Sequence, residues 1–209
     1  MCAAGLYTCL AEAGPYLNDH FSNNARQQTL ASGQLRPGFS PSSAFMVLNE
    51  CLWALGSITA SLEPADTRAA IVDSCSNLAV SISEARPAMS LAWYVRALVD
   101  DARDDVAALR SDLLKSQATD AAGQWIAQLR VPLAEKHLAD LDAKGLAAHE
   151  ADLGLLVQSR SGIAAIAGRY VADAAFRSRI TALVSKLPPG DQQRFIDNVR
   201  SAADDAATQ

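Results

Sequence analysis

The chain has few aromatic residues, no long apolar run and no cluster of positive charge. Phe, Trp and Tyr make up 6% of its 209 residues, whereas alanine alone makes up about a fifth. No stretch reaches the ~20 apolar residues of a membrane-spanning helix. The formal net charge is −5, with basic residues scattered singly among acids, which argues against a non-specific nucleic-acid binder. The composition predicts a soluble, acidic, alanine-rich protein with no membrane partner.

The chain has four cysteines, Cys2, Cys9, Cys51 and Cys75, and their spacing indicates whether they bind a metal or are buried as thiols. They form no CxxC pair, and no histidine stands at a metal-ligand spacing from them. Cys51 and Cys75 fall on apolar helical stripes, so we expect reduced thiols that act as small buried hydrophobes. The first residues lack the basic segment of a signal peptide. We therefore expect a reducing compartment and a cytoplasmic location.

Apolar residues recur at helical spacing along most of the chain, and the alternation typical of strands is almost absent. The longest clean segment is 87–116, where an apolar stripe runs from Val95 to Leu113. A shift of phase near Ala175 leaves open whether 161–187 is one helix or two. Mostly short connections imply antiparallel neighbours. The sequence predicts an all-α fold, a single bundle of about six to eight mostly antiparallel helices.

The clearest loop lies at residues 33–41, where two prolines and two glycines fall within nine residues. Such a segment ends one helical region and starts another. We therefore expect an N-terminal helical arm with its Pro/Gly loop over residues 1–41. The main helical bundle is expected over residues 42–209, and the two parts together form one domain.

The most distinctive motif is an acidic cluster made of Asp100, Asp101, Asp104 and Asp105. It resembles the aspartate-rich box of isoprenoid synthases, in which carboxylates one helical turn apart hold magnesium against a diphosphate. The resemblance implies that these four aspartates bind Mg²⁺; no other cofactor is expected. At 100° per residue, however, their side chains centre opposite the Val95–Leu113 stripe, which favours a solvated acidic face.

Motifs for catalysis are absent from the sequence. The chain has no GxSxG nucleophile elbow, no P-loop and no GxGxxG fingerprint. Its histidines, His20, His137 and His149, show no HxxxH or ExxH spacing, so we expect surface or capping residues rather than metal ligands. No catalytic residue is predicted. A Cys–His pair brought together by the fold stays open, because such partners need not be sequence neighbours.

Two short segments have features of a contact surface. Gly168 and Ala172 stand four residues apart on one helix face, where small side chains let backbones approach closely. That contact is either a packing contact inside the core or a homotypic interface. Trp93 and Tyr94 are adjacent and cannot share one helix face, so one of the two is a candidate surface aromatic for an interface.

Three separated pieces of the first half look like coat proteins of rod-shaped plant RNA viruses, which are four-helix bundles that assemble around RNA. The pieces are Phe39–Phe45, Asp66–Arg68, and Pro87 followed by Val99–Ala102. The resemblance implies that Arg68 contacts an RNA phosphate. It also implies that Asp100 and Asp101 lie near the RNA. The C-terminal half shows no counterpart in that family.

Three functions from different classes are compatible with these patterns. The favoured one is a non-enzymatic helical interaction or assembly protein that binds itself or a protein partner through helix faces. It rests on the alanine-rich helices, the small-residue segment and the lack of a catalytic motif. One alternative is an α-bundle enzyme whose pocket is built from distant residues, with the acidic cluster as a candidate magnesium and diphosphate site. The other alternative is an RNA-coating subunit.

Overall fold

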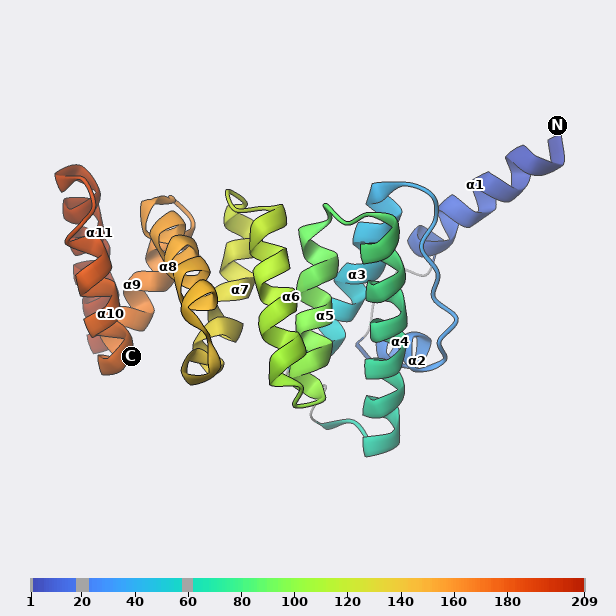
Figure 1. Cartoon of the computed structure of the whole chain (residues 1–209), viewed down its shortest axis with the longest axis horizontal. Coiled ribbons are helices and arrows are strands. Elements are labelled where there is room, and N and C mark those ends of the chain that lie inside the picture. The colour runs from blue at the N-terminus through green and yellow to red at the C-terminus, as the bar shows by residue number, and fades with distance from the viewer. Residues whose placement is uncertain (1, 18–22, 58–61, 209) are drawn as a thin grey trace. The chain divides into compact units, whose positions relative to one another are not determined.

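The chain folds into α-helices, as the computed structural model in Figure 1 shows. The structure describes residues 2–17, 23–57 and 62–208. Within these ranges there are eleven α-helices and no strand, which confirms the predicted all-α fold. The number of helices exceeds the expected six to eight. One reason is that the long segment expected over 87–116 is broken into two helices.

The helices pack as two compact units, residues 1–119 and residues 120–209. The first unit contains α1 (Cys2–Leu17), α2 (Asn23–Ala31), α3 (Pro41–Gly56), α4 (Ala65–Ala85), α5 (Ser90–Ala102) and α6 (Val106–Thr119). The second unit contains α7 (Gln124–Lys136), a 3₁₀ turn (Leu138–Asp140), α8 (Ala143–Gln158), α9 (Gly162–Ala172), α10 (Ala174–Val184) and α11 (Pro189–Ala207). The expected division after residue 41 does not coincide with the boundary between these units.

The loop at residues 33–41 is tied to the first unit by hydrogen bonds. Glu12 of α1 accepts the backbone N–H of Phe39 at 2.8 Å and the backbone N–H of Ser40 at 3.0 Å. Ser40 in turn caps α3, because its hydroxyl accepts the N–H of Ser43 at 3.0 Å. Pro41 fills the first helical position, where its missing N–H costs nothing. The loop therefore fixes the start of α3.

Helix α5 is central to the first unit and packs against α3, α4 and α6. Figure 1 shows α5 running antiparallel to both α4 and α6. The core of this unit is aliphatic and its residues are almost fully buried: Val47, Leu48, Ile71, Leu78, Ile82, Leu91, Val95, Val99 and Leu109. This agrees with a low aromatic content, since branched aliphatic side chains do most of the packing.

The helix expected over 87–116 ends at Ala102 and restarts at Val106. Asp104 has a φ of +57°, in the left-handed region that aspartate tolerates better than most residues. The N–H of Asp105 donates to Asp100 O at 2.9 Å, and the N–H of Asp104 donates to Asp101 O at 3.2 Å. These two bonds form a Schellman cap, usually built on glycine. Because an aspartate takes the place of that glycine, no glycine in the sequence marks the break. The apolar spacing continues across it and predicts one helix.

In the second unit α9 packs against α8, α10 and α11. The buried cluster comes from all five helices of the unit: Ala127, Val131, Leu153, Leu156, Val157, Ile163, Ile166, Ala167, Phe176, Ile180, Val184 and Phe195. Asp173 separates α9 from α10 and caps α10, because its Oδ1 accepts the N–H of Phe176 at 3.0 Å. Residues 161–187 therefore contain two helices, one of the two outcomes that the sequence left open.

Candidate functional site

The acidic cluster is divided between the end of α5 and the start of α6. Asp104 occupies the left-handed cap position, and Asp105 Oδ1 accepts the N–H of Ala108 at 3.1 Å to start α6. The magnesium interpretation requires the four aspartates to lie on one face of one helix. Because the helix is broken at Asp104, they do not. Among the described residues, no group of three or more His, Cys, Asp or Glu side chains is placed to hold a metal ion. A magnesium site at this cluster stays a prediction.

One member of the cluster is electrostatically unusual. Asp100 Oδ2 is buried and has no hydrogen-bond partner within the described part of the chain. Burial, together with the charges of Asp112 and Asp105, raises the pKa of Asp100 to about 6. Burial and the neighbouring negative charges therefore destabilise the ionised form of Asp100 in the fold.

The two adjacent aromatics of α5 both have intramolecular roles. Tyr94 is 5% exposed and lies in the core of the first unit. Trp93 donates its indole N–H to Pro87 O at 2.7 Å. The guanidinium of Arg96 and the ammonium of Lys115 lie 4.7 and 4.6 Å from the Trp93 ring centroid. Both cations stack on the ring as cation–π pairs, so Trp93 is already engaged within its own unit.

The other predicted contact residues lie at the surface of their units. Gly168 and Ala172 are both exposed, and a Cβ added at Gly168 would meet no atom within 4 Å. Gly168 therefore makes no close packing contact with other described parts of the second unit, and the use of Gly168 and Ala172 as a homotypic interface stays a prediction. Arg68, in the first turn of α4, is exposed and donates to Glu63 O at 3.3 Å. A phosphate contact at Arg68 likewise stays a prediction.

Cys51 of α3 and Cys75 of α4 are joined by a disulfide bond, with Cα atoms 5.6 Å apart. Both residues are fully buried, as their apolar stripes indicated, but the expectation of reduced thiols is wrong for this pair. Periodicity gives the face of a helix, not which helices meet. Cys9 is a free, exposed thiol. Because disulfides persist in oxidising environments, cysteine usage no longer supports a reducing compartment.

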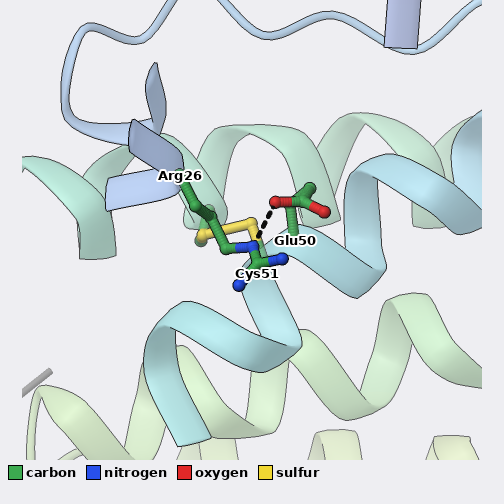
Figure 2. The surroundings of a disulfide bond; sticks show 4 residues. Arg26, Glu50 and Cys51 are labelled. Carbon is green, nitrogen blue, oxygen red and sulfur yellow. Dashed lines mark hydrogen bonds and ion pairs between the residues drawn. A yellow bond between two sulfur atoms is a disulfide. The ribbon is translucent and has the colours of Figure 1, made fainter. Parts of the chain in front are cut away.

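An ion pair lies beside the disulfide (Figure 2). Arg26 of α2 places Nε 2.5 Å from Oε2 of Glu50 on α3. Glu50 directly precedes Cys51, so an ion pair and a covalent bond hold α2, α3 and α4 together at neighbouring positions. The two cysteines have no exposed surface, which makes this junction a structural feature rather than a reactive site.

Helix α3 also presents large side chains outward. Its outer side follows a spacing of three or four residues: Ser42, Phe45, Asn49, Trp53 and Gly56, here called the α3 face. Phe45 is 42% exposed and Trp53 is 57% exposed. Exposed aromatic residues grouped on one face are typical of binding surfaces. The sequence interpretation placed the surface aromatic at Trp93 or Tyr94 and missed this face.

Glu135 of α7 is the centre of an ionic network in the second unit. Its side chain is 2% exposed, and Oε1 lies 2.6 Å from Nε2 of His149 on α8. Oε2 lies 3.1 Å from Nη2 of Arg169 on α9 and also contacts Nη2 of Arg179 on α10. Three helices therefore contribute one charged or polar residue each to a single buried carboxylate on a fourth helix.

The electrostatics of this network determine its hydrogen bonding. Burial by itself raises the pKa of Glu135, but the hydrogen bond and charge of His149 and the charges of Arg179 and Arg169 outweigh it and lower the pKa. Glu135 is thus ionised near neutral pH and accepts the Nε2–H of His149. Two atoms of the network, His149 Nδ1 and Arg179 Nε, are buried with no hydrogen-bond partner among the described residues.

A groove of about 510 Å³ lies next to this network, with α8 and α10 forming most of its lining. Its polar lining includes His149 and Arg179, the two residues that carry the unpartnered atoms, and Glu150 and Lys186. Its apolar lining is aliphatic: Leu138, Leu146, Ala147, Ala151, Leu153, Ala182, Leu183 and Leu187. The arrangement combines an aliphatic wall with hydrogen-bonding atoms that lack partners, which is typical of a small-molecule site.

The sequence interpretation expected His149 at the surface or as a cap, and this is wrong, because His149 is 4% exposed. His137 does occupy the C-cap position of α7, as a capping residue should. His20 lies outside the described residues. One sequence signal points to His149: it is in phase with the buried residues Leu153 and Leu156 of the same helix. Its partner Glu135, fourteen residues earlier, has no such signal.

Comparison with known proteins adds no assignment. No protein-family model, no curated protein and no solved structure matches the chain. The resemblances to viral coat proteins and to isoprenoid synthases therefore rest on the short motifs alone. Among the described residues, no helix has the length and apolar character needed to cross a bilayer.

Proposed function

We propose that the chain is a non-enzymatic assembly protein that binds a second copy of itself through the α3 face. The observation that carries the proposal is the exposure of Phe45 and Trp53, at 42% and 57%, on one side of one helix. In a chain with so few aromatic residues, these two rings keep a large part of their surface exposed on the outer side of α3, whereas the described cores are packed mainly with aliphatic side chains. Burial of these rings against another surface would be favourable.

The spacing of the α3 face suits a two-fold axis. Asn49 is the midpoint between Phe45 and Trp53, which stand eight residues and about 12 Å apart along the helix. An antiparallel pairing of two α3 helices about Asn49 would place Phe45 of one copy opposite Trp53 of the other. The same contact then occurs twice, which is the defining property of an isologous dimer.

Charge supports the same pairing. Glu50 is the only charged residue of α3, and it is already paired with Arg26 of α2. Two copies of α3 can therefore approach without like-charge repulsion and without stripping water from an unpaired charge. Gly56 and Ser42 at the two ends of the α3 face are small, which leaves the two aromatic rings as the main protruding groups.

Size-exclusion chromatography with light scattering, at several protein concentrations, tests this proposal. We expect a dimer or a larger defined oligomer for the wild type and a monomer for Trp53→Ala and for Phe45→Ala/Trp53→Ala. The matched control is Trp125→Ala in α7, because Trp125 is also an exposed tryptophan, at 46%, but belongs to the second unit. We expect this control to keep the wild-type mass.

A wild type that is monomeric at every concentration overturns the proposal, as does a Trp53→Ala variant that keeps the oligomeric mass. Absorbance of nucleic acid should be recorded across the same peaks. An assembly that carries RNA, and that falls apart as salt is raised, would overturn self-binding as the basis of assembly and favour the RNA-coating alternative.

A further inference from the structure

We propose that the groove between α8 and α10 is a binding site for a small amphipathic anion, a carboxylate on an aliphatic chain. The site lies in the second unit, whereas the α3 face lies in the first, so the two proposals can fail separately. The argument starts from two buried polar atoms, His149 Nδ1 and Arg179 Nε, that have no partner in the described part of the chain. Leaving such atoms unpaired is costly.

Both atoms belong to residues that line the same groove. The His149 side chain is 3% exposed and is held in place through its Nε2, which lies 2.6 Å from Glu135 Oε1. Arg179 is held through its Nη2 by the second oxygen of Glu135. The two residues are thus fixed by one buried carboxylate while one nitrogen of each is left over. Such pre-positioned, unsatisfied groups beside a cavity are the usual anchors of a ligand.

The donor capacity of the lining selects an anion. Arg179 Nε carries a hydrogen in every state and can only donate. Lys186, which lines the same groove, has an ammonium group that can only donate as well. A carboxylate supplies two acceptor oxygens, one for Arg179 Nε–H and one for the Lys186 ammonium. His149 donates Nε2–H to ionised Glu135, which holds its ring at the same groove.

The charges of the lining agree with this choice. Lys186 of α10 also lines the groove, and no described acidic side chain forms an ion pair with it. Arg179 shares its acid, Glu135, with Arg169, so that carboxylate is contacted by two guanidinium groups. The one acid in the lining, Glu150, is exposed to solvent, where water screens it.

The rest of the lining selects an aliphatic body. The side chains of Leu146, Leu153, Leu183 and Leu187 line the groove, and none of the residues that line it is Phe, Tyr or Trp. Most of the lining is therefore aliphatic, and a hydrocarbon chain bound there gains from each methylene removed from water. Volume and composition therefore fit a short fatty acid better than a nucleobase or a sugar.

Isothermal titration calorimetry of the full chain with octanoate tests the site. Octanol and octylamine are the comparison probes, because they keep the chain and replace the carboxylate with a neutral or a cationic group. We expect octanoate to bind about tenfold more tightly than either, the loss expected when charge-assisted hydrogen bonds cannot form. Octanol or octylamine that binds as tightly as octanoate overturns the anionic class, and no binding by octanoate overturns the site.

Variants locate the binding to this groove. Leu146→Glu places a carboxylate on an exposed leucine of the lining and should abolish octanoate binding. Its matched control is Ile196→Glu, an exposed apolar residue of the same unit outside the groove, which should bind as the wild type does. Lys186→Ala should weaken binding several-fold, and Lys144→Ala, an exposed lysine of α8 outside the lining, should not.

The ¹⁵N chemical shifts of the His149 ring show whether the ligand binds next to this residue, independently of the affinity. Octanoate should move the Nδ1 resonance more than the Nε2 resonance, since His149 lines the groove and its Nδ1 has no described partner, whereas Nε2 keeps Glu135. Octanoate binding that leaves both His149 resonances unchanged, or that survives Leu146→Glu, would place the ligand elsewhere and overturn the proposal. Circular dichroism of each variant confirms that the helices are intact.

Discussion

Arg130 and Asp152 form a two-point ion pair inside the second unit. Arg130 Nε lies 2.7 Å from Asp152 Oδ2, and Arg130 Nη2 lies 2.7 Å from Asp152 Oδ1. Their side chains are 2% and 3% exposed, so the pair is almost completely removed from water. The remaining capacity of the guanidinium is used in part by Asp120 O, 3.2 Å from Nη2. The pair fixes α7 against α8 in one register.

Removing one partner of this pair should be strongly destabilising. In Asp152→Ala the guanidinium of Arg130 stays buried without its counter-charge, and we expect a loss of about 3–5 kcal/mol in the free energy of unfolding of the second unit. The double variant Arg130→Met/Asp152→Leu should recover most of it, because apolar groups of similar size replace the pair. Hydrogen exchange of α7 and α8 peptides, measured in a urea titration, gives these values.

An exposed pair of the same unit is the control for this prediction. Arg200 and Asp197 are 71% and 57% exposed, and Asp197→Ala should change the free energy of unfolding by only about 0–1 kcal/mol. A cost for Asp152→Ala that is no larger than the cost for Asp197→Ala would contradict the burial argument.

The disulfide should stabilise the first unit measurably. It closes a segment of 24 residues, and the chain-entropy relation gives about 3 kcal/mol for a loop of this length. We expect Cys51→Ala/Cys75→Ala to lower the urea midpoint of the first unit by a corresponding amount, and reductant to lower the midpoint of the wild type only. Cys9→Ser, at an exposed thiol, is the control without effect. Alkylation of Cys51 and Cys75 in unfolded, unreduced protein would show that the bond is absent.

Gly168→Ala distinguishes a solvated helix face from a close backbone contact. Since an added Cβ meets nothing within 4 Å, the substitution should stabilise α9 by about 0.5–1 kcal/mol through helix propensity. Gly162→Ala is the matched opposite, because its Cβ would lie 2.9 Å from Leu156 Cβ and 2.6 Å from Ser159 Oγ. We expect the first variant to melt higher and the second lower. A Gly168→Ala variant that dissociates an oligomer would instead support the predicted interface at Gly168 and Ala172.

Asp100→Asn should stabilise the first unit in a pH-dependent manner. The folded pKa of Asp100, about 6, is above its ordinary value of 3.8, so the folded state disfavours the charged form. The ionised form of Asp100 therefore lowers the free energy of unfolding. This loss is complete above pH 6, declines as the pH falls from 6 to 3.8, and vanishes below 3.8. Asp100→Asn removes this loss, and its stabilising effect should therefore be present at neutral pH and absent in acid.

Urea midpoints of the first unit at neutral and acidic pH measure this effect. Asp104→Asn is the matched control, because it neutralises an exposed member of the same cluster and asparagine also tolerates the left-handed conformation. Equal stabilisation by Asp100→Asn at both pH values would argue that the variant acts through packing and not through ionisation.

The helical fold was predictable because its signal is local. Apolar stripes such as Val95 to Leu113 report which side of a segment is buried, and the all-α prediction needed nothing more. The break at Asp104 was not predictable from periodicity. The two helices on either side of it keep their apolar residues in phase, and the cap uses aspartate at a position where glycine is the usual signal.

The candidate sites depend on which helices meet, and one sequence does not contain that information. Glu135, His149 and Arg179 come from three helices, and nothing in their spacing brings them together. The same limit applies to Cys51 and Cys75, whose burial was predicted and whose bond was not. On α3, the 57% exposure of Trp53 depends on which described helices pack against that side, which periodicity cannot report.

The Cys51–Cys75 bond closes part of the backbone into a covalent ring, and the connection between α3 and α4, residues 57–64, lies within that ring. A peptide bond hydrolysed anywhere between the two cysteines would therefore leave a single molecule of nearly unchanged mass. The two fragments would separate on a denaturing gel only after reduction. A cut outside the ring would release a fragment on the denaturing gel without reduction. Whether a reductant is needed therefore shows whether a cut lies between Cys51 and Cys75 or outside that segment.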